Sequence, residues 1–486
     1  MSSALHPGRN ARPLAGLMNR LGVVLLVAAV GVVLGLQYML PDKRVIAVSV
    51  AIILFGAAWR LDMVSGLGVM VLALPFPRAT IFGSTNLAFV LLVLVLWLLR
   101  ITQRQSAPPR RSPLDAPVVA LFIAYVVSFH NVTGARDLTE ALTRFVIMAA
   151  CMLAFFLIVN NLQSERDFRR LLNFQAVSAL LVCLLALYEL THPGQSFIPG
   201  WIGFQQTHGT EFDTRNVRVG SIFFDFELLS EYCALNGLLV LYLLLRAEST
   251  SRRVAYGLLL FLVVFVLFTT VTRGAFIALG VGGLYLLWIV RRRVSFVVLV
   301  TATAALLAGF LAMNFYVANF TRSGDIVERL GATTFAGGWM PDSRVGAWTG
   351  AWERIFEHPL IGHGPYYSAR TGTRMWFWPH CLYLFVANNV GFIGLGIFLW
   401  LLWTLFRISH PPTDDLRRGG FAQSFLIIGH VQLVVFIVDE IKIEYLRSMV
   451  YPFQVWVMFA LIVAAYQVSR RTPQLGPAGA PGVIRS

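Results

Sequence analysis

Long uninterrupted runs of apolar residues recur along this 486-residue chain, and they restrict its fold more than any other feature. Two of them, Leu87–Leu99 and Leu258–Phe268, contain no charged residue. A helix that crosses a bilayer needs roughly 20 apolar residues, whereas a helix on a soluble domain alternates apolar and polar faces. The composition agrees, since 57% of the residues are hydrophobic and 13% are charged. We therefore expect an integral membrane protein and exclude a soluble enzyme.

The apolar runs, separated at their charged breaks, predict fourteen membrane spans. The runs at 45–59 and 63–76 are short enough to form a re-entrant or tilted hairpin, so the expected count lies between twelve and fourteen. The expected fold is all-α, a polytopic bundle of transmembrane helices. The predicted spans are 21–40, 45–59, 63–76, 81–99, 114–129, 142–160, 171–190, 226–245, 254–270, 274–290, 294–313, 381–406, 421–438 and 450–467.

Arginine-rich segments alternate with arginine-poor ones along the predicted topology. The net charge of +15 comes mainly from segments that fall on the same side of the membrane as the N-terminus. The positive-inside rule assigns that side to the cytoplasm. Because the basic residues are spread over many short segments without an aromatic-rich basic patch, we expect no nucleic-acid partner. The basic segments lie near 9–20, 100–111, 166–170, 246–253, 291–293, 407–418 and 470–485.

This orientation divides the chain into tails, spans and outer loops. We expect a cytoplasmic tail at 1–20, eleven spans within 21–313, three more within 381–467, and a disordered cytoplasmic tail at 468–486. Two outer loops are long, 192–225 and 314–380. Long loops on a rigid scaffold commonly carry binding and catalysis, so the candidate site is expected on the outer side.

One amphipathic helix is expected within the second long loop, from Asp342 to Phe356. Asp342 or Ser343 can cap its start, and Pro359 ends it. The helix would either lie in the outer headgroup layer or pack on the bundle. The apolar face has Val345, Trp348, Trp352, Ile355 and Phe356, and the polar face has Arg344, Glu353 and Arg354.

Several motifs around the outer loops together resemble one family. The pattern is similar to that of the O-antigen ligase and polymerase superfamily of bacterial envelope glycan enzymes, with Cys381 in place of the usual Asn and Thr272 in place of the commoner Ser. The motifs are Arg218-Val219-Gly220, Thr272-Arg273-Gly274-Ala275, Arg344 with Trp348, His358-Pro359-Leu360-Ile361-Gly362-His363-Gly364, His380-Cys381-Leu382-Tyr383-Leu384 and Gly391-Phe392-Ile393-Gly394.

The resemblance implies a GT-C-like glycosyltransferase in the bacterial inner membrane, with its active site facing the periplasm. The implied donor is an oligosaccharide linked to a polyprenyl diphosphate, and the acceptor is a glycan or a lipid. Polymerase and ligase activity both fit.

The implied chemistry assigns roles to outer-side cations. A lipid diphosphate leaving group gathers negative charge, which guanidinium groups can bind bidentately. Arg218, Arg273 and Arg344 are therefore the expected diphosphate ligands, with Arg215 and Arg354 as neighbouring alternatives. These arginines can neutralise the diphosphate by themselves, so no cofactor and no metal are expected.

His380 is the expected catalytic base, together with Arg273 in the catalytic pair, because a neutral imidazole can accept the proton of the acceptor hydroxyl. His358 and His363 are rivals for this role or supporting residues. Outer-side acids are expected to bind the acceptor or support the arginines, and their ordinary interpretation is as salt-bridge partners. These acids are Asp225, Glu227, Glu231, Asp439 and Glu440.

Two other classes of function are compatible with parts of the sequence, a cysteine peptidase and a transporter or flippase. The His380-Cys381 pair suggests a cysteine peptidase, but adjacent residues on one helix do not face each other. A secondary transporter or lipid-linked glycan flippase would have a similar number of spans. Transporters tend to contain repeats and charges at mid-membrane. This chain has no evident repeat, and its polar residues gather in the outer loops, which favours surface chemistry.

Overall fold

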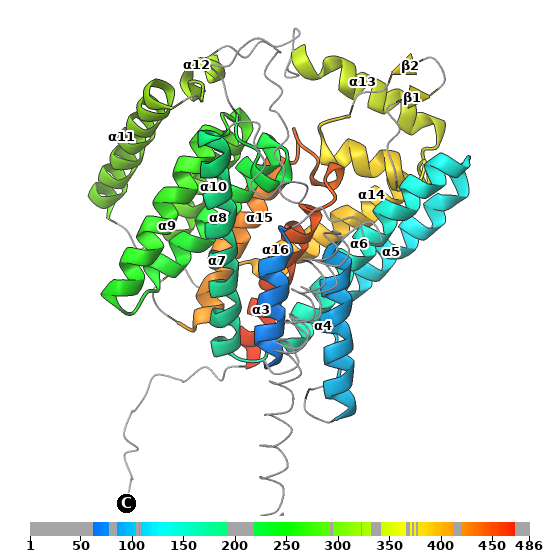
Figure 1. The fold of residues 1–486 in the computed structure, drawn as a ribbon, viewed down its shortest axis with the longest axis horizontal. Coiled ribbons are helices and arrows are strands. Elements are labelled where there is room, and N and C mark those ends of the chain that lie inside the picture. The colour runs from blue at the N-terminus through cyan, green and yellow to red at the C-terminus, as the bar shows by residue number, and fades with distance from the viewer. Residues whose placement is uncertain are drawn as a thin grey trace, which may run out of the picture.

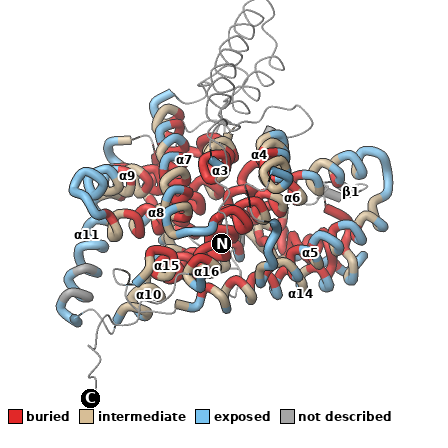
Figure 2. Tube along the Cα trace, turned by 90° about the horizontal axis from the view of Figure 1, so that it is seen from below, coloured by how far each residue is buried: buried red, intermediate tan, exposed pale blue. Residues whose placement is uncertain are grey.

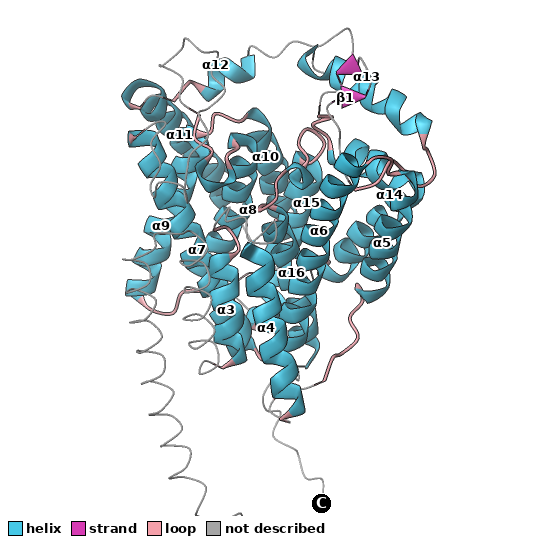
Figure 3. Ribbon diagram, turned by 45° about the vertical axis from the view of Figure 1, so that its right-hand side comes forward, coloured by secondary structure: helices cyan, strands magenta, loops and turns pink. Residues whose placement is uncertain are grey.

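The computed structural model describes residues 62–76, 85–103, 106, 108–192, 218–291, 295–321, 323–331, 342–365, 370–371, 374–375, 378–411, 416 and 419–471. Several predicted segments lie outside these residues: the spans 21–40 and 45–59, the tail 1–20, and Arg215. The predicted tail 468–486 also lies outside them, except for residues 468–471, which end the last helix. The described part is almost entirely helical, which confirms the all-α bundle (Figure 3).

Twelve of the predicted spans correspond to helices. Within the described residues, nine segments are long and apolar enough to cross a membrane, one in each of α6 to α11 and α14 to α16. The helices are α3 (Met63–Ala73), α4 (Thr85–Thr102), α5 (Asp115–Ser128), α6 (Ala135–Asn161), α7 (Glu165–Thr191), α8 (Phe226–Leu245), α9 (Thr250–Thr269), α10 (Arg273–Val290), α11 (Phe296–Phe320), α14 (Leu382–Ser409), α15 (Phe421–Asp439) and α16 (Pro452–Arg471).

Shorter elements connect these helices. The helix α12 (Ile326–Gly331), the helix α13 (Asp342–Glu357) and the two-residue strands β1 (Arg370–Thr371) and β2 (Arg374–Met375) belong to the second long loop. The strands pair antiparallel. Three 3-10 turns are η1 (Phe129–Asn131), η2 (Ser221–Phe223) and η3 (Tyr445–Arg447).

The core of the bundle lies where α8, α15 and α16 meet α6 and α7 (Figure 2). Trp456 on α16 and Phe436 on α15 are fully buried there. At the rim, large apolar side chains such as Leu284 on α10 and Leu306 on α11 are about 70% exposed. An apolar rim of this kind is what a lipid-facing surface requires, because lipid tails do not penalise exposed apolar groups.

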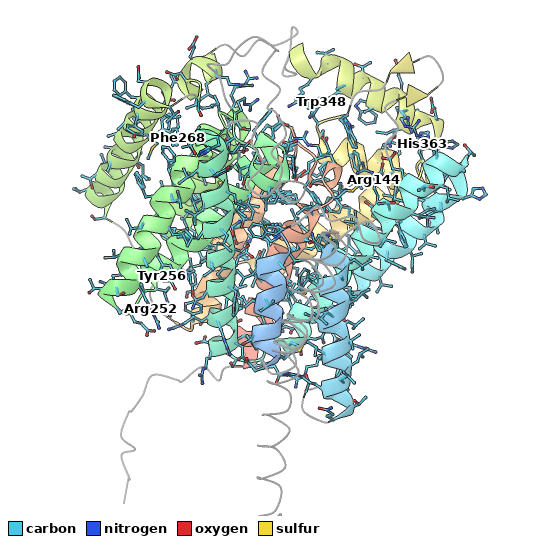
Figure 4. All side chains as sticks on the ribbon, in the orientation of Figure 1. Arg144, Arg252, Tyr256, Phe268, Trp348 and His363 are labelled. Atoms are coloured by element: carbon cyan, nitrogen blue, oxygen red, sulfur yellow. The ribbon has the colours of Figure 1, made fainter. Side chains whose placement is uncertain are left out.

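The long-loop elements occupy one end of the bundle. In Figure 1, α12, α13 and the strands lie together at that end, and Figure 4 labels Trp348 and His363 there, with Arg252 at the opposite end. The loop residues and the basic segment at 246–253 are therefore separated by the length of the helices, as the predicted topology requires.

Helix ends differ from the predicted span ends in several places. The helix α6 begins at Ala135 rather than near 142, and α11 continues to Phe320 rather than ending at 313. Hydropathy marks the part of a helix that lies in hydrocarbon, whereas the backbone can stay helical through polar headgroup-level residues. The described part of the third run, α3, is only about 16 Å long at 1.5 Å per residue. That length is about half of the hydrocarbon core.

Candidate active site at the outer end

The start of α8 places two carboxylates at the end of the bundle that carries the long-loop elements. Asp225 caps the helix, because its Oδ1 accepts hydrogen bonds from the backbone N–H groups of Glu227 (2.8 Å) and Leu228 (3.3 Å). Glu227 lies in the first turn, where the helix dipole favours a negative charge. Both side chains are mostly buried, with 23% and 14% exposed. Buried carboxylates need cationic partners.

Arg447, at the end of η3, is the main partner of these carboxylates. Its Nη2 lies 2.6 Å from Oδ2 of Asp225 and 2.9 Å from Oε2 of Glu227, and its Nη1 lies 3.6 Å from Oε1 of Glu444. Burial disfavours the charged guanidinium, but the three carboxylates outweigh burial and raise the pKa of Arg447. Arg447 is therefore a permanent cation that joins α8 to the loop between α15 and α16.

His380 contacts the same arginine. Nη1 of Arg447 donates a 2.9 Å hydrogen bond to Nδ1 of His380, and Oε2 of Glu227 lies 3.8 Å from that nitrogen. His380 has a φ of 46°, a left-handed conformation that is uncommon for a residue other than glycine. Burial, followed by the charge of Arg344, lowers the pKa of His380 to about 4. The imidazole is therefore neutral at physiological pH.

Arg344 reaches the cluster from α13. Its Nη2 donates to Oε1 of Glu227 at 3.0 Å, so Glu227 is held between Arg344 and Arg447. The structure thus brings together three predicted site residues, Asp225, Arg344 and His380, from three separate parts of the chain.

Arg218 binds the break between α9 and α10. Its Nε donates to the carbonyl of Thr270 (2.9 Å), and its Nη2 donates to the carbonyl of Val271 (3.3 Å) and the hydroxyl of Thr272 (3.1 Å). The guanidinium also lies over the ring of Phe226. Carbonyls at the end of a helix lack intrahelical donors, and Arg218 satisfies them. Arg218 therefore holds the break from which Arg273 projects.

A second group of cations surrounds Arg273, the first residue of α10. Its Nη1 donates to the backbone carbonyl of Arg329 on α12 at 3.2 Å. Burial and the neighbouring charges of Arg329 and Arg273 lower the pKa of Arg218 to about 9. Burial and Arg273 likewise lower the pKa of Arg329. The three guanidinium groups are thus close enough to repel one another, a situation that a bound anion would relieve.

Lys442 adds a further cation beside Arg273. Its ammonium lies 3.0 Å from Oδ1 of Asp439, and its side chain crosses over Gly274. A Cβ at Gly274 would come within 1.2 Å of Cε of Lys442. The glycine that follows Arg273 therefore leaves the space that Lys442 occupies.

Four fully buried acids lie behind these cations, and Glu231 is one turn further along α8 than Glu227. Burial raises the pKa of Glu444 to about 8 and that of Glu440 well above its usual range. Glu440 is also tied to α14, because its carbonyl accepts from the N–H of Leu382 (2.9 Å). The predicted acid Glu231 is thus part of the inner layer of the cluster. The four acids are Glu231, Asp439, Glu440 and Glu444.

His358 and His363 lie in a turn that packs against a break in α14. At Gly391 (φ 69°) the helix is interrupted, and the freed carbonyls of Asn388 and Asn389 accept hydrogen bonds from the N–H groups of His363 (2.8 Å) and Gly364 (3.0 Å). A Cβ on Gly391 would lie 2.1 Å from the carbonyl oxygen of Leu360. The glycines of both motifs are therefore required by close backbone contact.

Neither histidine of this turn joins His380 through a contact between described residues. Nε2 of His363 bonds the carbonyl of Arg354 (2.7 Å), and the His358 and His363 rings are 4.7 Å apart. Burial, opposed in part by this bond, lowers the pKa of His363 to about 4.

The helix α13 has the predicted extent, but the residues on its buried face differ from the prediction. Ala347, Trp348, Ala351 and Ile355 pack on Cys381, Leu384 and Ala387, so the helix packs on the bundle. The prediction that Arg354 lies on the polar, exposed face is wrong, because only 3% of it is exposed. Arg354 adjoins Ile355 on the stripe that contacts α14, whereas Trp352 and Phe356 stack on each other at the exposed side.

Cys381 caps α14 and is buried. Burial raises the pKa of its thiol, which is the opposite of what a nucleophilic cysteine requires. Across the described residues, no three His, Cys, Asp or Glu side chains are grouped so that they could hold a metal ion.

The comparison with known families matches the part of the chain that supplies Arg273, Arg344 and His380. Residues 258–399 match the family model described as O-antigen ligase. This segment of the chain is similar to the O-antigen ligase family. The match confirms the resemblance drawn from the motifs and supports glycan transfer of the O-antigen ligase and polymerase type in general. No curated protein matches the sequence significantly.

The matched residues begin within α9 and end within α14, and they include only part of the candidate site. Arg218, Asp225 and Glu227 precede the matched residues, and Arg447 follows them. Four charged residues of the cluster were not predicted from the sequence: Arg447, Arg329, Lys442 and Glu444. A signal was present for Arg447, because it is an arginine in a loop that the predicted topology places on the outer side, where the positive-inside rule disfavours arginine.

Proposed function

We propose that this protein transfers a glycan from a polyprenyl diphosphate to an acceptor hydroxyl at the periplasmic face of the inner membrane. The observation that carries the proposal is the gathering of three arginines at the long-loop end of the bundle, where Arg273 contacts the backbone of Arg329 and Arg218 binds Thr272, the residue before Arg273. The charges of these arginines and of Glu227, which belongs to the Arg344–Glu227–Arg447–His380 cluster, act on one another. Mutually repelling guanidinium groups at a membrane surface suit a lipid-borne diphosphate, which carries several charged oxygens.

The proposed transfer is a single displacement at the anomeric carbon of the glycan. The acceptor oxygen forms a bond to the anomeric carbon, and the bond from that carbon to the diphosphate oxygen breaks with its electron pair left on the phosphate. The hydroxyl proton passes to a basic group of the site. The arginines act by stabilising the charge that develops on the leaving group. Polymerase and ligase activity share this step and differ only in the acceptor.

The test is transfer by the purified protein from a polyprenyl-diphosphate-linked oligosaccharide, with and without EDTA. Because guanidinium groups would neutralise the leaving group, we expect transfer to continue undiminished in EDTA. The same glycan on a polyprenyl monophosphate is the control, and it should be a poor donor. Loss of transfer in EDTA with recovery on adding Mg²⁺ or Mn²⁺ would contradict the arginine mechanism. No transfer with any lipid-linked donor would contradict the function itself.

The proposed orientation makes a second expectation. Glu328 on α12 and Ser251 on α9 are both exposed, at opposite ends of the bundle, and all four native cysteines are buried. In intact cells, an impermeant thiol reagent should label Glu328→Cys and leave Ser251→Cys unlabelled until the cells are opened. The reverse pattern would invert the topology and place the site in the cytoplasm.

A further inference from the structure

The hydrogen bond between Arg447 and His380 fixes where the imidazole carries its proton. Arginine has donors only, so Nη1 of Arg447 must donate in the 2.9 Å contact and Nδ1 of His380 must accept. A neutral imidazole has one protonated nitrogen, and that nitrogen is therefore Nε2. A ring rotated by half a turn would point a C–H group at the guanidinium, which has no acceptor to offer.

The other charged groups that face His380 keep this arrangement in place. Glu227 is 3.8 Å from Nδ1, beyond hydrogen-bond distance, and both of its oxygens are bound by Arg344 and Arg447. The cations Arg344 and Arg447 disfavour protonation of the ring. With 31% of the side chain exposed and Nδ1 occupied, the edge of the ring that carries Nε2 is the one that can meet a ligand.

We propose that His380 serves transfer as a hydrogen-bond donor, through Nε2–H, to an oxygen of the donor's diphosphate, and that Arg447 is the positioning residue that sets this tautomer. The inference rests on the proposed function and differs from the expectation of a catalytic base. As the glycosidic bond breaks, its electron pair stays on the phosphate oxygen, and the Nε2–H bond strengthens with that charge. An Nε2 that already carries a proton has no lone pair with which to accept another.

The hydroxyl proton then needs a different acceptor, and Asp225 is the best placed. It is the more exposed of the two carboxylates that Nη2 of Arg447 contacts, with 23% of its side chain accessible. Its Oδ2, which contacts Arg447, has a second lone pair that can take the proton, and burial raises the pKa of the carboxyl.

Two amide substitutions separate a donor from a base. A glutamine side chain places its N–H donor near the position of Nε2, whereas an asparagine amide reaches only the position of Nδ1. Neither amide can act as a base. We expect His380→Ala to lower transfer by about 10²-fold, as for a lost transition-state donor. His380→Gln should retain at least about tenfold more activity than His380→Ala, and His380→Asn should resemble His380→Ala. His130→Gln, at an exposed histidine of η1, is the matched control.

The tautomer can be observed directly by NMR of ¹⁵N-histidine-labelled protein, with His380→Gln used to assign the signal. Wild type should show an unprotonated Nδ1 and a protonated Nε2 at neutral pH. Arg447→Lys keeps a donor and should preserve this pattern, whereas Arg447→Met should lose it. This measurement reads the wild-type ring directly and does not depend on the activity of any variant.

The outcomes are distinguishable. A protonated Nδ1 in wild type, or a folded His380→Gln that is as inactive as His380→Ala while high pH rescues both, would overturn the donor role in favour of a base. Full activity in His380→Ala would remove His380 from the site. Failure of wild type to use any lipid diphosphate donor would instead contradict the proposed function, and would leave the tautomer measurement unaffected.

Discussion

Replacing Arg447 with methionine is expected to abolish transfer and to lower the free energy of unfolding by about 3–5 kcal/mol, the cost of leaving buried charges without a partner. Arg447 is 12% exposed and contacts Asp225, Glu227 and Glu444. Methionine fills similar space but removes the charge, so the carboxylates of Asp225 and Glu227 would repel each other in a dry environment. Thermal unfolding in detergent and the transfer assay measure the two effects separately.

Arg144→Met is the matched control for this loss. Arg144 lies at the same end of the bundle and is 14% exposed. Nη1 of Arg144 donates to the backbone carbonyl of Leu446 at 3.1 Å, and the one carboxylate that it contacts among the described residues, Glu140, is 38% exposed and lies one helical turn away. Such pairs contribute only about 0.3–0.5 kcal/mol. Adding Glu227→Gln to Arg447→Met should restore part of the stability and none of the activity. Equal destabilisation by both arginine substitutions would show that Arg447 has no special role.

The deficit of Arg447→Met should also depend on pH. Without the guanidinium, the folded-state pKa values of Asp225 and Glu444, which burial already raises, rise further above their values in the unfolded chain. Groups with raised folded-state pKa values cost stability once pH exceeds the unfolded values, which lie near 4. The deficit should therefore be small near pH 4 and should grow as the pH rises through neutral.

Most of the fold could be predicted from the sequence because lipid imposes a simple rule. Every spanning backbone must satisfy its own hydrogen bonds, so an apolar run of sufficient length is a helix. The amphipathic helix at 342–357 was equally accessible, since its caps and periodicity are local. The face that this helix buries could not be predicted from the sequence, because Arg354, expected on the polar face, is buried. The face that is buried is set by the packing of α13 on α14, which begins 28 residues further along the chain than Arg354.

The residues of the candidate site could be predicted only where they belong to a short sequence motif. Arg273 stands in a short break and His380 precedes a span, and both positions can be read from a few neighbouring residues. Arg447 could be linked to them only through Glu227, which lies 220 residues away in sequence. A sequence pattern also could not show that two nitrogens of Arg218 donate hydrogen bonds to the carbonyls of Thr270 and Val271, at the end of α9. Such contacts are set by how the helices pack.

Arg273→Lys is expected to lower transfer by about 10²-fold or more while the protein still inserts and folds. Lysine keeps the charge but loses the planar fork that binds a phosphate through two parallel N–H groups. Arg273 also stands at the N-terminus of α10, where the helix dipole disfavours a cation, so stability does not explain the arginine. Its charge adds to that of the helix end, Arg218, Arg329 and Lys442, and strengthens an anion site.

The control is Arg252→Lys at the exposed, opposite end of the bundle, which should transfer at the wild-type rate. With the lipid diphosphate donor varied at saturating acceptor, Arg273→Lys should lose most in the transfer step itself, because the bidentate contact strengthens as charge moves onto the leaving oxygen. A variant that only binds donor more weakly, and recovers full turnover at saturation, would assign Arg273 to docking of the lipid. Wild-type behaviour at all donor concentrations would remove Arg273 from the site, and the anion would then have to be held by Arg218 and Arg329 without it.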